Sequence, residues 1–285
     1  MTDSTKKQNG EIVIRDVEYD GRVILSGNGN LITLKLTRSE PGDQTSYINY
    51  IKPLIFAEEL GFPHLLSVID TRDEWFYAVH PKRIVPSLKD QDDVTGEKII
   101  GFEGTACLQY LAAKFDNEGL WTGRTWWEKA QVLSWTAFQT AGLGATAKTD
   151  FTSCEDTLRD RIPSPCPRHA QILTGTTRLH ANTLKAWDLL EKRLDLPGKQ
   201  HVALPDRPTL VDLSYFPFGM PWMFGFFGVD IKDWPSIQRW SELMLARPAV
   251  QKVMDSAPSI GHRSAFCDDV EQVGSETRKR RYLNA

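Results

Sequence analysis

The stretch that decides the fold is V-H-P-K-R-I-V-P-S-L-K-D at Val79–Asp90, followed after a polar turn by I-I-G-F-E-G-T-A-C-L-Q-Y-L-A-A-K-F at Ile99–Phe115. Apolar and polar side chains alternate across Ile84–Leu88, which is typical of a strand, yet Pro86 lies in its middle. Proline has no backbone N–H and is unfavourable in a central strand. A cis peptide bond before Pro86 would explain its presence, because the resulting turn would leave the N–H and C=O of Val85 open to a ligand.

The residues after this proline predict a hairpin and then a helix. Asp90–Lys98 is a polar turn, Ile99–Phe102 a returning strand, and Gly104–Lys114 a helix with one apolar face. A helix N-terminus suits a carboxylate, and the carboxylate of Glu103 suits an ammonium, so this corner would bind an amino-acid-like zwitterion. The residues alone leave open a trans proline on an edge strand and an ordinary first-turn acid.

Upstream, the sequence predicts a strand, a helix and a second strand. The first strand is Leu31–Leu36, where apolar and polar residues alternate, and the second is Leu65–Ile69. Between them runs a helical apolar pattern containing Pro53, which is tolerated only in the first turn, so the helix is expected to begin near Asn49. The residues before the first strand, 11–29, form a lead-in whose final G-N-G is expected to be a turn.

Composition excludes several classes of protein. The 285 residues are 41% hydrophobic and carry a net charge of -3, which gives no reason to expect nucleic acid or an acidic membrane as partner. Four cysteines are widely spaced and the histidines form no zinc pattern, so reduced thiols and no metal are expected. The N-terminus lacks an apolar signal core, and the most apolar run, Pro217–Val229, is too short to span a membrane, which points to the cytoplasm.

The second half of the chain is dominated by helical periodicity. Trp126–Thr146 and His169–Leu194 are the longest predicted helices. Thr209 and Asp212 have the N-cap and N3 spacing of a capping box before a strongly apolar run.

The pattern x-P-x-x-x-V-P-x-L, a short hairpin and E-x-x-A resembles the glutathione-binding half of glutathione transferases. R-S-E-P at Arg38–Pro41, followed after an insertion by N-Y-I-K-P, is similar to fungal members related to the yeast prion protein Ure2p, and W-P-S-I-Q-R-W through R-P-A-V at Trp234–Val250 resembles the family's ending. The resemblance implies an α/β thioredoxin-like N-terminal domain plus an all-α helical C-terminal domain. The expected parts are an extension (1–30), a glutathione-binding domain (31–116), a linker (117–125), a helical domain (126–256) and a second extension (257–285).

The resemblance also implies where glutathione would bind and react. The thiolate would be stabilised by the Asn49 amide, with Ser39, Ser46 and Tyr47 as alternative donors; without the resemblance Asn49 is better read as a helix N-cap. The implied glutathione-binding residues are Lys52, Lys82, Arg83, Val85, Pro86, Glu103, Gly104 and Thr105. The implied pocket for an apolar second substrate is lined by Trp126, Trp127, Phe138, Met220, Trp222, Met223 and Phe224, each of which alone could equally be core.

Two positions depart from the family pattern. N-P-N-x-K/R-V-P becomes His80-Pro81-Lys82-Arg83-Ile84-Val85-Pro86, so Ile84 replaces the usual basic residue. E-S-x-A becomes Glu103-Gly104-Thr105-Ala106, which loses a serine hydroxyl. Weaker or altered glutathione binding is therefore expected.

The resemblance implies an enzyme that adds the glutathione thiolate to an electrophilic, hydrophobic small molecule in a fungal biosynthetic pathway, and a homodimer. If the adduct of a conjugated olefin expels glutathione again, the enzyme would be a cis–trans isomerase, and the chain resembles the olefin-isomerising transferase of pseurotin-type pathways. A non-catalytic interaction module with the transferase fold is the competing hypothesis from another class.

Overall fold

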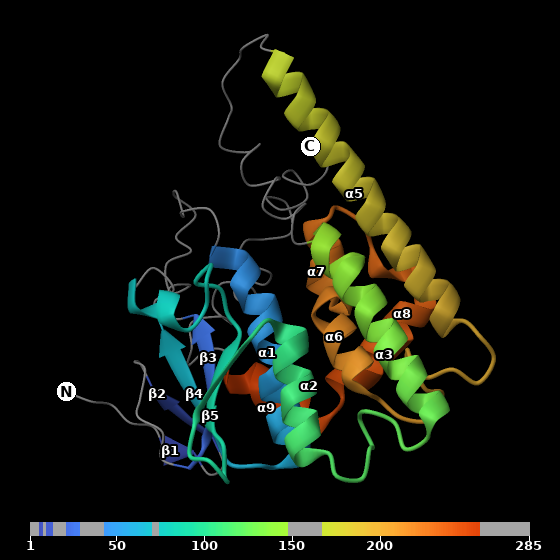
Figure 1. Ribbon diagram of the computed structural model, residues 1–285. Coiled ribbons are helices and arrows are strands. Elements are labelled where there is room, and N and C mark those ends of the chain that lie inside the picture. Colours follow the sequence, from blue (N-terminus) through green and yellow to red (C-terminus); the bar gives the residue numbers. More distant parts are fainter. Residues whose placement is uncertain are drawn as a thin grey trace. The chain divides into compact units, whose positions relative to one another are not determined.

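A computed structural model describes residues 6–7, 10–13, 21–28, 43–69, 74–147 and 167–256 of the chain (Figure 1). Contacts within the chain define two compact units. Residues 1–39, 46–120 and 245–285 form the first unit, and residues 40–45 and 121–244 form the second. The predicted strand Leu31–Leu36 lies outside the described residues, as does Ser39.

The first unit is built on a six-stranded sheet with the strand order β1-β2-β4-β3-β5-β6. Strand β3 runs parallel to β4 and antiparallel to β5, and β5 and β6 form an antiparallel hairpin. The strands are β1 (Lys6–Lys7), β2 (Gly10–Val13), β3 (Val23–Asn28), β4 (His64–Ile69), β5 (Ser87–Gln91) and β6 (Lys98–Phe102). Its helices are α1 (Asp43–Leu60), the 3-10 helix η2 (Glu74–Ala78), α2 (Gly104–Phe115) and α9 (Pro248–Ser256).

Strand β3 lies within residues 11–29, which were expected to be a lead-in before the first core strand. Val23, Ile24 and Leu25 are each at most 3% exposed, and β3 pairs with β4 from Val23 opposite His64 to Asn28 opposite Ile69. Gly27 and Asn28 belong to the strand, so the predicted turn at G-N-G is wrong for these two residues. The apolar part of the strand is only three residues long, and pairing with β4 extends it into the polar residues up to Asn28.

The predicted onset of α1 near Asn49 is also wrong, because the helix begins at Asp43 and continues through Pro53. Proline lacks an N–H, so the C=O of Asn49, four residues earlier, cannot receive the usual helical hydrogen bond. The helix therefore accommodates Pro53 in its interior at the cost of one bond, and Asn49 cannot be its N-cap.

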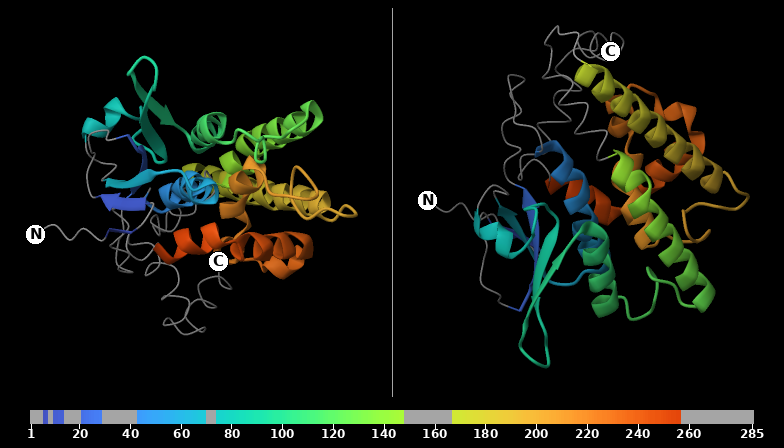
Figure 2. Two further views of the ribbon diagram at one scale, coloured as in Figure 1. Left: turned by 90° about the horizontal axis from the view of Figure 1, so that it is seen from below. Right: turned by 45° about the horizontal axis from the view of Figure 1, so that its top comes forward.

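Strand β5 begins only after Pro86, where hydrogen bonding to a neighbour becomes possible, so the expected strand Ile84–Leu88 starts three residues too early. The two faces of the sheet are covered differently. Asp90 faces α2, where its carboxylate accepts hydrogen bonds from Tyr110 Oη at 2.6 Å and Lys114 Nζ at 2.8 Å. Ser87 and Lys89, which alternate with Asp90 along β5, lie on the other face beside η2. Figure 2 shows α2 running beside the β5–β6 hairpin.

Helix α9 belongs to the first unit, although residues 126–256 were expected to form the helical domain. Arg247 Nε and Nη2 lie 2.5 and 2.7 Å from the two carboxylate oxygens of Glu59 in α1. Lys252 in α9 also donates to Glu58. These ion pairs join residues almost 200 positions apart, which no local pattern could predict.

The second unit is helical and is organised around buried aromatic rings. Trp187 is fully buried and stacks on Phe224 with centroids 4.1 Å apart, and its Nε1–H donates to the C=O of Phe218. The expected helix Trp126–Thr146 is interrupted at Gly142, the C-cap of α3, and the chain is helical again over 143–147. The elements are α3 (Trp126–Ala141), α5 (Pro167–Leu194), α6 (Leu210–Gly219), α7 (Pro221–Phe226), η3 (Ile231–Asp233) and α8 (Pro235–Leu245).

The predicted capping box is confirmed at the start of α6. The Thr209 side chain accepts from the backbone N–H of Asp212, and the Asp212 side chain accepts from the backbone N–H of Thr209. Asp212 is 0% exposed and also accepts from Val202 N and Trp240 Nε1, both at 2.9 Å. One carboxylate thus ties α6 to the preceding loop and to α8. Among the described residues, no helix combines the length and hydrophobicity needed to cross a membrane.

Candidate functional site

The peptide bond between Val85 and Pro86 is cis, which decides between the two alternatives that the residues alone left open. Both residues are buried, and they lie directly before β5. Pro86 is next to the N-terminus of α2: a Cβ added to Gly104 would lie 3.6 Å from Pro86 Cγ. The proline loop and the first turn of α2 therefore form one corner of the first unit.

Helix α1 completes this corner. The same added Cβ on Gly104 would lie 3.7 Å from Lys52 Cδ and 3.9 Å from the backbone oxygen of Asn49. Lys52 is only 4% exposed although it carries an ammonium group. The structure thus brings together Asn49, Lys52, Pro86 and Gly104 from three separate segments, with Val85, Glu103 and Thr105 as their chain neighbours. We call this group of seven residues the corner site.

Glu103 occupies the N-cap position of α2 in an unusual conformation. Its φ of 71° and ψ of 130° place it in a region that non-glycine residues rarely adopt. Its side chain makes no capping hydrogen bond and is 70% exposed. The backbone therefore turns the carboxylate outward beside the N-terminal amides of α2, where one ligand could meet both groups.

His80 anchors the start of the loop from His80 to Pro86 with its ring and its backbone. Lys82 N donates to His80 Nδ1 at 3.0 Å, and Arg83 N donates to the C=O of His80 at 3.0 Å. The ring is 2% exposed, and its Nε2 lies 3.8 Å from Glu103 Oε1. Nothing in the sequence singles out His80 except that the resembled family has asparagine at this place.

Lys82 and Arg83 differ in their surroundings. Lys82 is exposed, whereas Arg83 is half-buried, has a positive φ of 50° and places its guanidinium 4.4 Å from the centre of the Tyr77 ring. Both cations lie in the loop that leads into the corner site. Of the proposed thiol-activating residues, Ser46 and Tyr47 lie in α1 with Asn49, and Asn49 is half-buried.

Cys107 lies in α2 one turn after Glu103 and is fully buried. Burial, with a smaller contribution from the Glu103 charge, raises the pKa of its thiol to about 12. Thiolates are the reactive form of cysteine, so this thiol is inert near neutral pH. Cys107 therefore supplies no reactive thiolate to the corner site.

This gives a first testable prediction. Native protein treated with iodoacetamide at pH 8 should be alkylated at Cys107 at least about 100-fold more slowly than urea-unfolded protein, because both thiolate and access are lacking. Peptide mass mapping measures the rate at this residue alone. Comparable rates in native and unfolded protein would contradict the assigned burial.

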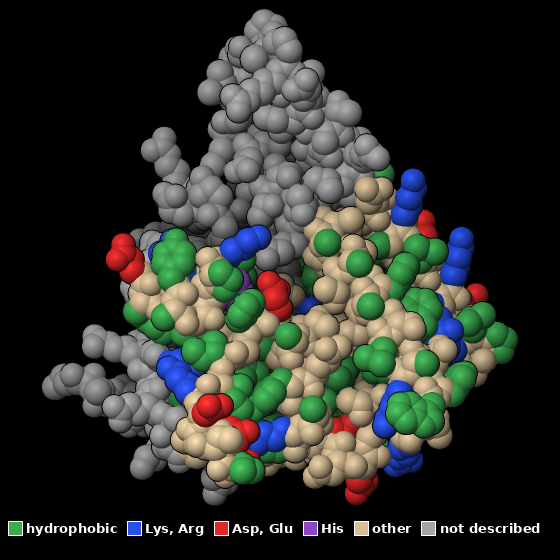
Figure 3. All heavy atoms as spheres, in the orientation of Figure 1, with side chains coloured by type: hydrophobic (Ala, Val, Ile, Leu, Met, Phe, Trp, Pro, Cys, Tyr) green, Lys and Arg blue, Asp and Glu red, His purple; other side chains and the backbone are tan. Residues whose placement is uncertain are grey.

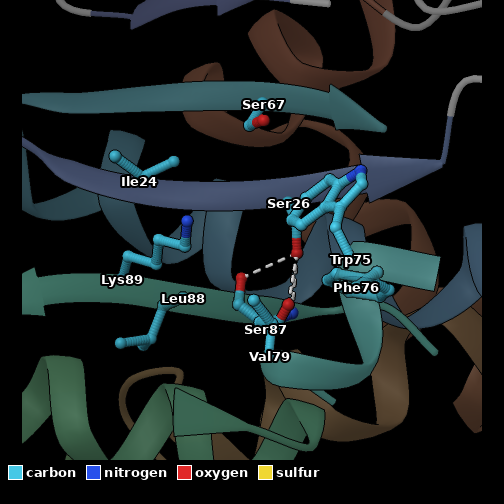
Figure 4. Close-up of a pocket in the computed structure, with 9 residues that line it drawn as sticks. All are labelled: Ile24, Ser26, Ser67, Trp75, Phe76, Val79, Ser87, Leu88 and Lys89. Atoms are coloured by element: carbon cyan, nitrogen blue, oxygen red, sulfur yellow. Dashed lines mark hydrogen bonds between the residues drawn. The ribbon is translucent and has the colours of Figure 1, made fainter. Parts of the chain in front are cut away.

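A separate hollow lies on the face of the sheet that η2 covers (Figure 4). Ser26 of β3 and Ser87 of β5 meet there, with their Oγ atoms 2.6 Å apart, and Trp75, Phe76 and Val79 close the hollow from the η2 side. Its cavity volume is only about 10 Å³, far smaller than typical pockets for organic ligands. The alternation of β5 directs Ser87 away from α2, so this hollow is distinct from the corner site.

The expected substrate-pocket residues fall into two groups. Trp126, Trp127 and Phe138 on α3 are 86%, 62% and 48% exposed. The others lie in or near α7, where Met220, Met223 and Phe224 are at most 1% exposed and Trp222 is half-buried. Apolar side chains reach the surface over much of the face shown in Figure 3, and Trp126 is among the most exposed in the described part of the chain.

No protein-family model matches the chain. A curated protein matches along its whole length: the glutathione S-transferase aclG of Aspergillus oryzae is 60% identical over 246 residues, 86% of this chain and 100% of that protein. The chain belongs to the glutathione S-transferase family. A second relative, the trimodular acetylaranotin synthesis protein ataIMG of Aspergillus terreus, is 58% identical over 228 residues, which are 80% of this chain and 22% of that protein.

Solved structures of this family share the fold. The glutathione transferase URE2P8 of Phanerochaete chrysosporium, crystallised with oxidized glutathione, superposes with a TM-score of 0.62 at 19% identity, over 86% of this chain and 98% of that one. This confirms the predicted α/β thioredoxin-like and all-α fold class and the resemblance to Ure2p-type members. The strands β4, β3, β5 and β6 and the helices α1 and α2 supply the thioredoxin-like part of this family member.

The room around Gly104 leads to a second prediction. A Cβ here would make only ordinary van der Waals contacts, so Gly104→Ser should fold normally. Its hydroxyl would stand at the first position of α2 and could donate to a ligand carboxylate, which should tighten glutathione binding roughly 3- to 10-fold. Calorimetry measures the change. Gly104→Ala is the matched control, because it adds the Cβ without the hydroxyl; equal affinities for the two variants would contradict this placement.

Proposed function

We propose that this family member adds the thiolate of glutathione to an electrophilic, largely apolar small molecule. The single observation that carries the proposal is the corner site, where a helix N-terminus, a cis-proline loop, an outward carboxylate and a buried lysine converge. Glutathione is a thiol with an ammonium and two carboxylates, so its charges match these groups. The name of the family supports the same substrate.

In this proposal each part of the site has one task. Glu103 binds the ammonium of the γ-glutamyl group, and the amides of Gly104 and Thr105 meet its carboxylate at the N-terminus of α2. The backbone of Val85 pairs with the cysteinyl amides of glutathione, since Pro86 itself offers no N–H. Lys52, with Lys82 and Arg83 in the nearby loop, supplies positive charge for the glycyl carboxylate.

The chemistry then needs a thiolate and a nearby electrophile. A free thiol of this kind has a pKa of about 8.5, so hydrogen-bond donors that favour the thiolate increase the reactive fraction at neutral pH. Asn49 is the leading donor, with Ser39, Ser46 and Tyr47 as alternatives. The thiol proton passes to solvent, the sulfur lone pair forms the new C–S bond, and the electrophilic carbon expels a leaving group or, in an activated alkene, passes charge to an atom that is then protonated.

The exposed aromatic residues Trp126, Trp127 and Phe138 of α3 are the candidate binding surface for the apolar second substrate. The second relative is named for acetylaranotin synthesis, which supports a substrate from fungal secondary metabolism for this chain as well. A homodimer, expected from the family, belongs to the same proposal and is measured by light scattering on the purified protein.

The proposal is tested by incubating the protein with glutathione and a panel of electrophiles that includes an activated aryl halide and conjugated polyenes. Free thiol and product mass are followed together. Conjugation consumes thiol and adds the mass of glutathione to the product, whereas isomerisation changes neither and alters only the chromatographic or spectral identity of the olefin. If no electrophile reacts and glutathione does not bind, the enzyme hypothesis is contradicted and the non-catalytic interaction module is favoured.

A further inference from the structure

His80 holds the loop that leads to Pro86 through both its backbone and its ring. Its backbone C=O accepts from Arg83 N at 3.0 Å, and its backbone N–H donates to the C=O of Phe76 at 2.9 Å. Its ring accepts from Lys82 N and packs against Phe102 with centroids 5.0 Å apart, at the end of β6 and next to Glu103. His80 therefore joins the loop, η2 and the residue that precedes Glu103.

The hydrogen bond at Nδ1 fixes how the imidazole can act. A neutral histidine has one donor nitrogen and one acceptor nitrogen. Because Lys82 N–H donates to Nδ1, that nitrogen is the acceptor, and the proton of the neutral ring is on Nε2. Nε2 lies 3.8 Å from Glu103 Oε1, which is too far for a hydrogen bond, but a rotation of the exposed Glu103 side chain toward the ring would let its carboxylate accept from Nε2–H.

We propose that His80 is a positioning residue for Glu103: in the glutathione complex the Glu103 side chain turns toward the ring, one carboxylate oxygen accepts a hydrogen bond from Nε2–H, and the other oxygen meets the ammonium of glutathione. This inference rests on the proposed function and extends it to a residue that touches no part of the substrate. Glu103 needs such support because its side chain is 70% exposed and makes no capping bond, so nothing else assigned to it in the described part of the chain fixes its direction. A carboxylate held in one direction binds a cation more tightly than one that must be ordered first.

Two substitutions separate this role from the structural role of the ring. In His80→Asn, the side-chain oxygen lies near the place of Nδ1 and can accept from Lys82 N, but nothing reaches Glu103. In His80→Gln, the longer amide reaches the place of Nε2 and can donate to Glu103, while the bond to Lys82 is weakened. The fold should tolerate His80→Asn, since the resembled family has asparagine there.

Calorimetry compares glutathione with deaminoglutathione, which lacks only the ammonium. His80→Asn should weaken glutathione binding about 10-fold and change deaminoglutathione binding by less than about 2-fold, as expected for an outer partner of a binding group. His80→Gln should bind glutathione more tightly than His80→Asn. In the Glu103→Gln background, His80→Asn should weaken glutathione binding by less than about 2-fold, because the carboxylate that His80 positions is already absent.

The contrary results are equally distinct. Equal losses for both ligands, or a larger loss in His80→Gln than in His80→Asn, would show that the ring acts only by holding the loop and would overturn the inference while leaving the proposed function intact. Failure of the unchanged protein to bind glutathione would overturn both. Ring ¹⁵N spectra at pH 8 without ligand test the geometry separately: a proton on Nε2 is expected, and a proton on Nδ1 would overturn the inference.

Discussion

Asp212→Ala is expected to lower the free energy of unfolding by at least about 3 kcal/mol, because it leaves several buried donors without an acceptor. The carboxylate accepts from Thr209 N at 2.8 Å, Thr209 Oγ1 at 3.1 Å, and Val202 N and Trp240 Nε1 at 2.9 Å each. These donors come from the start of α6, the loop before it and α8. The loss should lower the midpoint of thermal unfolding by roughly 10 °C.

The matched control is Asp230→Ala. Asp230 is also a capping aspartate, accepting from Lys232 N at 3.0 Å, but its side chain is 59% exposed and caps only the short helix η3. Asp230→Ala should lower the free energy of unfolding by less than about 1 kcal/mol. Asp212→Asn keeps one acceptor oxygen, so its free energy of unfolding should lie between those of the two alanine variants. It replaces Asp212→Ala in the test if that variant does not fold. Denaturant titration measures all three, and equal stabilities for Asp212→Ala and Asp230→Ala would contradict the central position of Asp212.

Glu103→Gln is expected to weaken glutathione binding by roughly 10- to 30-fold, since a charge-assisted contact to the ammonium is replaced by a neutral one on an exposed side chain. Deaminoglutathione should bind the variant and the unchanged protein equally well. Glu97→Gln, in the exposed turn between β5 and β6, is the control and should change affinity by less than about 2-fold. Unchanged glutathione affinity in Glu103→Gln would contradict the assignment of Glu103 as the residue that binds the ammonium.

The parts of the fold that could be predicted from the sequence have strong local signals. The polar turn followed by an apolar helical pattern indicated the β5–β6 hairpin and α2, and Pro86 raised a cis bond as one of two alternatives, the one that the family resemblance favoured. Thr209 and Asp212 indicated the start of α6 by their spacing alone. In each case the residues that determine the structure lie within a few positions of one another.

The parts that could not be predicted depend on contacts between distant residues. Strand β3 has only three strongly apolar residues, and its pairing with β4 decides its length. Helix α9 belongs to the first unit through ion pairs from Arg247 and Lys252 to α1. The early start of α1 contradicts the usual place of a proline such as Pro53 in a helix.

The same division applies to the corner site. Pro86 and Glu103 could be chosen from sequence because family resemblance identifies them, and the structure places Asn49 and Lys52 beside them. His80 could not be chosen from sequence. Its proposed role depends on where its two ring nitrogens lie relative to Lys82 N–H and to the Glu103 carboxylate. A histidine in sequence shows neither.

The most direct test of this account is a calorimetric titration of the purified protein with glutathione at neutral pH, with S-methylglutathione as a comparison for the free thiol. Saturable binding of about one glutathione per chain is predicted, with an altered affinity for the S-methyl compound because the donors that face sulfur would meet a thioether in place of a thiolate. No binding at millimolar glutathione would contradict the assignment of the corner site and with it the proposed transferase activity.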